Sequence, residues 1–202
     1  MRRSTILVAS LTLVGLVTGA ALAQEPGKAM SPEEQAMMAK WMEFATPGEP
    51  HKMLAQRVGS WTLKVSSWTS PDAPPTVTEG TSEVKAILDG RYVEETATGS
   101  FQGMPFHGRG FTGYDNLKKK YVSTWMDNMG TGIAMSEGDY DAAKKTFNYT
   151  GMWPDAMAGQ YKPMKGVETW TSPDVYKAEA YCQAPDGKGW WKMMELIYTR
   201  KK

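Results

Sequence analysis

A run of polar and aromatic residues around Asp127 has the residue types and spacing that ligand binding requires. Asp127 alternates with Ser123 and Trp125, and alternating side chains of a strand share one face. An acid beside an indole could hold a ligand inside a mostly apolar cavity. The same carboxylate could instead cap the turn that begins at Asp127-Asn128-Met129-Gly130. The sequence favours the capping role and leaves the binding role open.

Two further polar residues lie on a segment that alternates in the same way. His107 and Arg109 fall on one face of residues 106–114, with Phe111 beside them. If that face is the inner one, either residue could polarise a ligand. A lone histidine on a strand is more often a surface or hydrogen-bonded residue than a base. The binding role expected of this pair therefore depends on which way the segment faces.

Glu195 is another acidic candidate, and alternation leaves its direction open. It shares a face with Met193, and an interior position would raise the pKa of its carboxyl group. The opposite face, which holds Leu196 and Tyr198, could fill the interior instead. Arg200 shares a face with Leu196 and Tyr198 by alternation, and this favours the second arrangement.

Motifs for phosphate binding, metal binding or covalent catalysis are not recognisable in the sequence. The two histidines, His51 and His107, belong to different predicted elements, which argues against a zinc site. Methionine pairs such as Met193-Met194 could bind Cu(I), but on predicted strands they are better interpreted as packing. The single cysteine, Cys182, is interpreted as a buried apolar thiol. We expect no metal and no cofactor.

The segments that position these residues predict an all-β fold. Apolar and polar residues alternate in about ten short segments between turn signals, which is typical of a single antiparallel up-and-down β-barrel. A barrel of this size often encloses one small ligand. Residues 152–162 lack a strand pattern, and we expect them to form a lid over one mouth. The expected strands are residues 61–66, 76–88, 91–101, 106–114, 120–127, 131–139, 145–151, 164–171, 175–183 and 189–199.

The residues before the barrel predict export and a short helical lead-in. Residues 1–23 have a basic start, an apolar core and a small-residue box ending at Ala23, so we expect a signal peptide and a secreted or periplasmic protein. Residues 24–58 should hold a lead-in with one helix after Ser31-Pro32 and another at about 51–58, and residues 59–202 the barrel. Cleavage would reduce Lys plus Arg from 23 to 21 against 22 acidic residues. This near-neutral balance excludes nucleic acid as a partner.

Three sequence features resemble known families. Gly59-Ser60-Trp61 resembles the Gly-x-Trp of lipocalins and related calycins, in which an arginine of the last strand packs on the tryptophan, and Arg200 occupies that place. Residues 113–132 and 193–200 are similar to the signatures of a secreted bacterial family called domain of unknown function 1579. The resemblance covers roughly residues 33–202 and implies a calycin-like barrel with no established activity. If the barrel closes, Trp61 and Arg200 must meet.

The function expected from these patterns is the binding of a small, largely apolar molecule inside the barrel. The lining should include Trp125 and at least one of Arg109, Asp127 and Tyr149. One alternative is an enzyme with Asp127 or Glu195 as acid or base, although the missing motifs favour a protein that is not an enzyme. The other is a protein-interaction module whose barrel is filled. The sequence predicts no membrane span and leaves the oligomeric state open.

Overall fold

The computed structural model describes residues 29–184 and 187–202. Residues Trp41–Lys202 form one compact unit that contains the strands. The expected signal peptide, residues 1–23, lies outside the described residues. None of the helices in the described ranges has the length and apolarity needed to cross a membrane.

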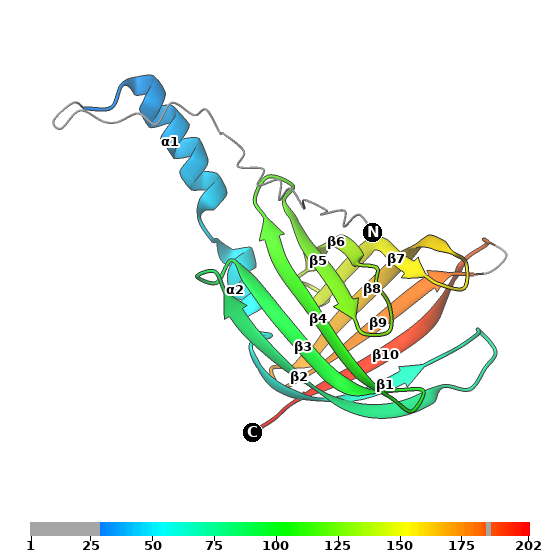
Figure 1. The fold of residues 1–202 in the computed structure, drawn as a ribbon. Helices are drawn as coiled ribbons and strands as arrows, with labels where there is room; N and C mark the ends of the chain where they lie inside the picture. The colour runs from blue at the N-terminus through cyan, green and yellow to red at the C-terminus, as the bar shows by residue number, and fades with distance from the viewer. Residues whose placement is uncertain (1–28, 185–186) are drawn as a thin grey trace, which may run out of the picture. The chain divides into compact units, whose positions relative to one another are not determined.

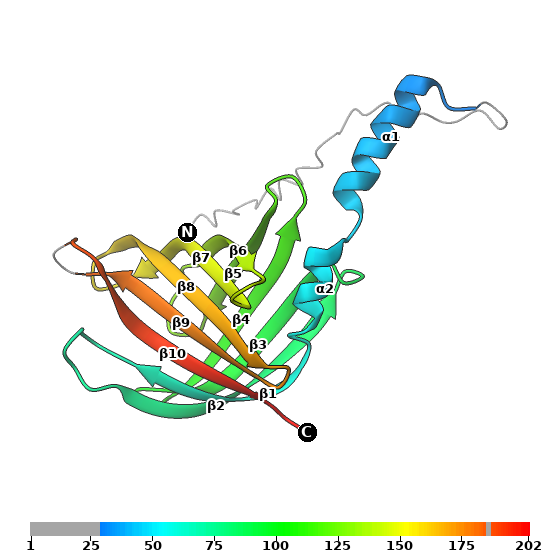
Figure 2. The ribbon, with the colours of Figure 1, turned by 180° about the vertical axis from the view of Figure 1, so that it is seen from behind.

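Ten antiparallel strands of the described chain form a closed barrel, as the sequence predicts (Figure 1). Each strand pairs with the next one along the chain, and β1 and β10 close the ring side by side (Figure 2). The strands are β1 (Gly59–Ser67), β2 (Thr76–Ile87), β3 (Tyr92–Phe101), β4 (Met104–Asp115), β5 (Lys120–Asp127), β6 (Ala134–Asp141), β7 (Thr146–Asp155), β8 (Gln160–Ser172), β9 (Val175–Gln183) and β10 (Trp190–Arg200).

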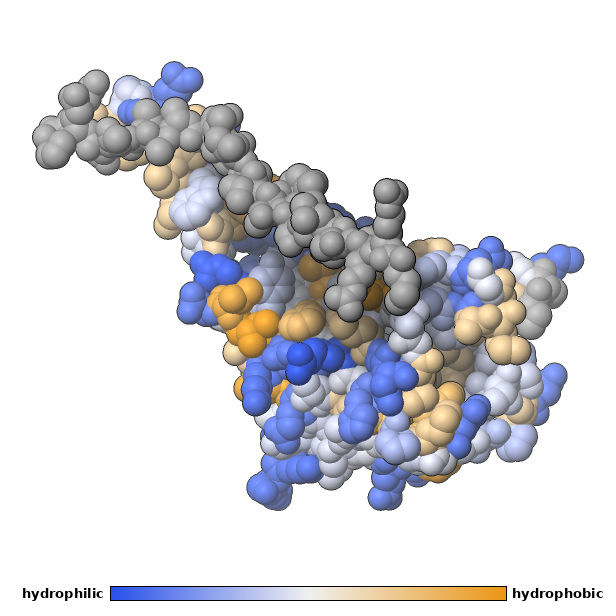
Figure 3. Space-filling model, in the orientation of Figure 1, coloured by the Kyte–Doolittle hydropathy of each residue, from blue (hydrophilic) through white to orange (hydrophobic). Residues whose placement is uncertain are grey.

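Alternation along the strands separates the apolar interior from the polar exterior. On β1, Trp61 and Leu63 are buried, whereas Thr62 and Lys64 are exposed. The outer surface in Figure 3 is accordingly mostly hydrophilic or intermediate in hydropathy. The interior at the Trp61 end is a cluster of aromatic rings. Its members are Trp61, Tyr121, Phe147, Trp170, Tyr176 and Tyr198.

The contact expected between Trp61 and Arg200 is present. The two residues pair directly across β1 and β10, and the guanidinium carbon lies 4.1 Å from the indole centroid. Gly59 makes room for this arrangement. Its φ is +138°, which side chains disfavour, and a Cβ there would lie 2.5 Å from Nη1 of Arg200. The glycine and the tryptophan of the Gly-x-Trp triplet therefore both serve barrel closure.

Two helices precede the barrel. Helix α1 (Pro32–Ala45) starts as the sequence predicts, because Ser31 and Glu34 exchange backbone-to-side-chain hydrogen bonds of 2.7 and 3.2 Å. Helix α2 (Glu49–Ala55) starts two residues earlier than expected and contacts β3 and β4. Its Leu54 is fully buried in the barrel core. The chain then turns into β1 through Arg57.

The expected lid at residues 152–162 is wrong. Residues 152–155 extend β7, residues 160–162 begin β8, and Pro154 pairs with Tyr161. The intervening turn is fixed by Asp155, whose Oδ1 accepts hydrogen bonds of 3.0 Å from the amides of Met157 and Ala158. Pro154 and Gly159 interrupt the alternation of apolar and polar residues in this stretch. The alternating pattern therefore predicted a shorter hairpin than the one that β7 and β8 form.

Replacing Trp61 should test how far the closed barrel depends on this contact. The side chain is fully buried, so we expect Trp61→Ala to lower the free energy of unfolding in urea by about 3–5 kcal/mol. Trp190, which is 39% exposed, provides a matched control. Trp190→Ala should change the free energy by about 0.5 kcal/mol or less. Equal losses in the two variants would contradict a closing role for Trp61.

Candidate functional site

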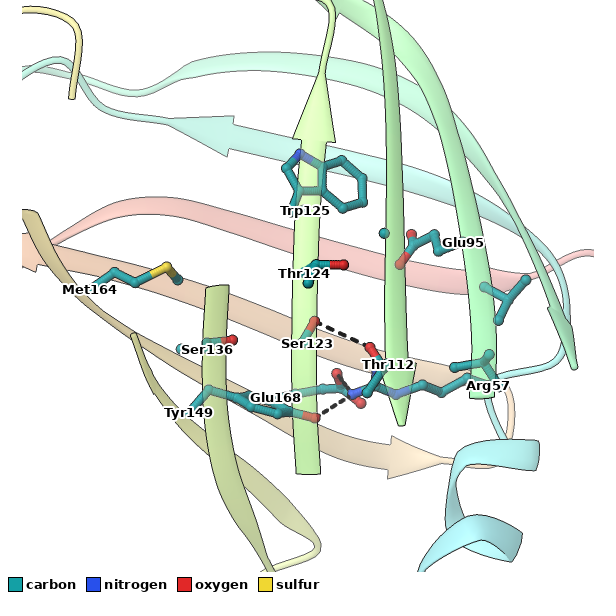
Figure 4. Close-up of a pocket in the computed structure, with 14 residues that line it drawn as sticks. Arg57, Glu95, Thr112, Ser123, Thr124, Trp125, Ser136, Tyr149, Met164 and Glu168 are labelled. Atoms are coloured by element: carbon teal, nitrogen blue, oxygen red, sulfur yellow. Dashed lines mark hydrogen bonds and ion pairs between the residues drawn. The ribbon is translucent and has the colours of Figure 1, made fainter. Parts of the chain in front are cut away.

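A cavity of about 140 Å³ lies inside the barrel, between the aromatic cluster and the mouth. Its wall combines residues from α2–β1 and from several strands (Figure 4). The polar side chains that line it include Arg57, Glu95, Thr112, Ser123, Tyr149 and Glu168. The apolar ones are Val84, Val93, Trp125 and Met164. An apolar cavity of about 150 Å³ can hold benzene, so the volume suits a ligand of that size.

Trp125 forms the aromatic wall, and two glycines of β4 make space for it. A Cβ at Gly108 would overlap the indole, and a Cβ at Gly110 would lie 2.8 Å from the indole Cε3. The ring therefore lies over the bare backbone of β4 instead of standing away from the sheet. Asp127 holds the other edge of the ring, because its Oδ2 accepts a 3.1 Å hydrogen bond from the indole Nε1.

Arg57 and Glu168 form a buried ion pair at the end of the cavity opposite Trp125 (Figure 4). Arg57 also donates a 2.9 Å hydrogen bond to the hydroxyl oxygen of Tyr149, and Glu168 accepts one of 3.0 Å from the indole of Trp170. Burial alone would lower the pKa of Arg57, but the charge of Glu168 keeps it well above its ordinary value. Arg57 is therefore held as a permanent cation. Its Nε is buried and has no hydrogen-bond partner among the described residues.

Glu95 is the second carboxyl group in the wall, and it has no ion-pair partner within the described part of the chain. Its Oε1 accepts hydrogen bonds of 2.7 Å from Ser82 and 3.0 Å from Tyr198, and both of its hydrogen bonds fall on this oxygen. Burial raises the pKa of the carboxyl group, and the two hydrogen bonds offset only part of that rise. Glu95 thus lies in the cavity wall with one oxygen uncommitted.

The arrangement is preorganised for binding because its polar groups are fixed by contacts of their own. Helix α2 and β1 position Arg57, while Tyr149 and Glu168 are held on β7 and β8. On β4 and β5, the hydroxyl of Thr112 donates a 3.2 Å hydrogen bond to Ser123. A ligand in this cavity would contact an aromatic ring at one end and polar groups at the other.

The structure brings together only part of the ligand-binding set expected from the sequence. Trp125 and Tyr149 both line the cavity. Asp127 faces inward at the end of β5, where its Oδ1 accepts a 2.9 Å hydrogen bond from the amide of Met129. It therefore caps the turn, which is the role that the sequence favours, and it also orients the indole of Trp125.

His107 and Arg109 share a strand face as expected, but that face is the outer one. Both are exposed, and Arg109 pairs with Glu94 at 3.3 Å on the outside of the barrel. They line a second depression of about 370 Å³ together with Met126 and Asp127, so three of the expected binding residues, His107, Arg109 and Asp127, lie together there. Beside His107 and Arg109 the inward positions of β4 are Gly108 and Gly110, which have no side chains, so alternation did not reveal the inner face there.

Glu195 also faces outward, where Lys192 donates a 2.6 Å hydrogen bond to it. Leu196 and Tyr198 face inward, as the parity of Arg200 indicates. Cys182 is buried, and burial raises the pKa of its thiol, which agrees with the packing role expected for it. Within the described residues, no three His, Cys, Asp or Glu side chains are gathered as a metal site would require.

Sequence reasoning missed three charged residues of the wall, Arg57, Glu95 and Glu168. Two of them left a signal. Glu95 alternates with the buried Val93 and Ala97, and Glu168 alternates with the inward Trp170. A charged residue at an inward position of an otherwise apolar strand face should have been read as a site candidate. Arg57 lies outside any periodic pattern and left none.

Comparison with known proteins identifies the family. A sequence profile described as "Protein of unknown function (DUF1579)" matches residues 46–200. The chain belongs to the DUF1579 family. The profile begins just before α2 and so includes Arg57 as well as the barrel. A search of curated proteins finds no match for this DUF1579 chain.

Solved structures similar to this DUF1579 chain include a phycobiliprotein lyase and a redesigned β-barrel. The S-type phycobiliprotein lyase CPES from Guillardia theta aligns with a TM-score of 0.53 at 11% identity, covering 80% of this chain and 97% of the lyase. A redesigned β-barrel aligns with a TM-score of 0.37 at 13% identity, covering 75% of this chain and 95% of that protein. At such identities, the likeness to the lyase concerns the fold alone.

Removing one partner of the buried ion pair should be costly. Glu168→Gln would leave the cation of Arg57 uncompensated, and we expect the free energy of unfolding to fall by about 3–5 kcal/mol. Glu137 pairs with Lys118 at 2.8 Å on the surface and provides the control. Glu137→Gln should cost less than about 1 kcal/mol in the same urea measurement. Similar small losses in both variants would show that the interior pair is solvated.

Glu95→Gln should have the opposite effect on stability. A carboxyl group whose pKa is raised on folding stabilises the folded state below the unfolded pKa, which for glutamate is 4.5, and that contribution is lost as the pH rises through the folded pKa. The neutral amide avoids this loss. We expect Glu95→Gln to be more stable than the wild type at pH 7, with the difference narrowing towards pH 4. Urea unfolding at the two pH values measures it, and a variant less stable at both would contradict an unpaired carboxylate.

Proposed function

We propose that this protein binds one small, largely apolar molecule inside its barrel, in the space between the indole of Trp125 at one end and the Arg57–Glu168 pair at the other. The observation that carries the proposal is the 140 Å³ cavity lined by Trp125 and by the fixed Arg57–Glu168 pair. Binding sites commonly combine an apolar wall with a few fixed polar groups that orient the ligand.

The cavity volume supports a compact ligand, smaller than the drug-sized molecules that fill pockets of about 300–1,000 Å³. The unpartnered Nε of Arg57 supports a hydrogen-bond acceptor on that ligand, because a buried donor without a partner costs free energy. The ligand we propose is therefore largely apolar, as the sequence predicts, with one or two polar groups.

Neither alternative function gains a specific observation. The cavity argues against a filled barrel that serves only to bind another protein. For an enzyme, Glu195 would have to reach the interior, and it faces outward beside Lys192. Asp127 is committed to the indole of Trp125 and to the turn. The proposed site of action is outside the cytoplasm, and the support for it is the leader pattern of residues 1–23.

Filling the cavity should abolish binding. Gly166 lines it, and a Cβ there would meet Tyr149 at an ordinary distance of 3.6 Å, so Gly166→Leu should place a side chain in the cavity without backbone strain. We expect toluene to bind the wild type, seen as ligand-observed NMR saturation transfer, and its affinity to fall about tenfold or more in Gly166→Leu.

Two further variants make the test specific. Thr150→Leu adds the same side chain to an exposed position of β7 and should leave toluene binding unchanged. Trp125→Ala should weaken it by about 1 kcal/mol or more, given the area that an aromatic ring buries. Toluene binding that survives in Gly166→Leu would place the ligand elsewhere. Native mass spectrometry of protein purified from its own host would then give the mass of the natural ligand.

A further inference from the structure

The charges inside the cavity do not balance when both of its carboxyl groups are ionised. Arg57 is the one cation among the described residues that line it, and Glu168 neutralises that cation directly. Glu95 is left over, held by two hydroxyl groups on one oxygen only. Burial of an ionised carboxylate without a counter-charge is unfavourable, so the cavity favours a ligand that supplies a positive charge.

The strand register places Glu95 beside an aromatic ring. Glu95 pairs with Gly110 across β3 and β4, and Gly110 pairs with Trp125 across β4 and β5. The three residues therefore form one row on the inner face, and the middle one has no side chain. Since the indole lies over Gly110, it extends towards Glu95, which Figure 4 shows at a level between Trp125 and Arg57. A carboxylate next to an indole is a combination that binds organic cations, by ion pairing and by cation–π attraction.

An anionic ligand fits the same cavity less well. The direct ion pair with Glu168 already compensates the charge of Arg57, and an added anion would bring a second uncompensated negative charge near Glu95. The Nε of Arg57, which has no hydrogen-bond partner among the described residues, can donate to one neutral acceptor and does not require an anion. A cation leaves the cavity electrically neutral with every carboxylate ionised.

We propose that the ligand carries a small organic cation, such as an ammonium group, which binds between the carboxylate of Glu95 and the indole of Trp125. This inference rests on the proposed binding function and names the chemical class of its ligand. The apolar part of the ligand then lies against Val84 and Val93, which flank Glu95 in the wall. Ser82 and Tyr198 keep the carboxylate in place from the other side.

The test compares probes of similar size and different charge: benzylammonium, benzyl alcohol, toluene and benzoate. In wild-type protein at pH 7, benzylammonium should bind about tenfold more tightly than benzyl alcohol, and benzoate should bind most weakly. Glu95→Gln should remove the preference for benzylammonium and leave the affinity for toluene within about twofold. Glu94→Gln, which removes the neighbouring outward carboxylate, should preserve the preference.

A pH series gives a second measurement that needs no variant. The charged and titratable groups around Glu95 are Arg57, Glu168, Tyr176 and Tyr198, from the α2–β1 connection, β8, β9 and β10. Protonation of Glu95 at low pH should weaken benzylammonium and leave toluene unaffected. Equal affinities for benzylammonium and benzyl alcohol, or a preference that survives in Glu95→Gln, would overturn the cation proposal while toluene binding upheld the cavity. Failure of every probe, toluene included, would overturn the proposed function itself.

Discussion

The guanidinium group of Arg200 joins the two ends of the barrel sheet to the segment that precedes it. It lies on the indole of Trp61 and donates hydrogen bonds of 2.8 and 2.7 Å to the carbonyl oxygens of Gln56 and Val58. Arg57 lies between those two residues, and its own carbonyl accepts a 2.9 Å hydrogen bond from Trp61. Closure of the barrel therefore fixes the backbone that directs Arg57 inward. The candidate site depends on a contact made outside it.

The two interior carboxyl groups show how one barrel can combine stability with a binding function. Both carboxylate oxygens of Glu168 have partners, which are the guanidinium of Arg57 and the indole N–H of Trp170. The ion pair fixes the position of Arg57. Glu95 accepts hydrogen bonds on one oxygen only, and because burial raises the pKa of its carboxyl group, its ionised form costs stability that a ligand could restore. Residues that lower stability and have no evident structural role are expected at functional sites. This difference between two glutamates, more than cavity volume, marks Glu95 as the residue to test first.

Local patterns predicted the barrel because each strand has one polar and one apolar face. The Gly-x-Trp triplet at residues 59–61, together with Arg200 in the last strand, predicted that the barrel closes. The same patterns were less informative about the site. On β4 the inward positions next to His107 and Arg109 are Gly108 and Gly110, so the side chains of His107 and Arg109 were the conspicuous ones although they face outward. Arg57 is placed by contacts with residues more than fifty positions away, such as Thr112 and Glu168, and no local spacing encodes those. Glu95 was predictable from its apolar neighbours Val93 and Ala97, and it was overlooked.

The size of the binding space depends on positions 108, 110 and 125, because the indole of Trp125 lies over the backbone of two glycines. Any side chain at Gly108 or Gly110 would displace the indole. A smaller residue at 125 would make room for a side chain at 108, whereas a Cβ at 110 would still lie 2.9 Å from the backbone oxygen of Thr124. Family members that bind larger or smaller molecules should therefore differ at 108 and 125 together and keep the glycine at 110, with a gain of bulk on β4 matched by a loss on β5. Substitution at one of these positions alone should be tolerated poorly, so ligand size would diversify through coordinated changes in a single row of the sheet.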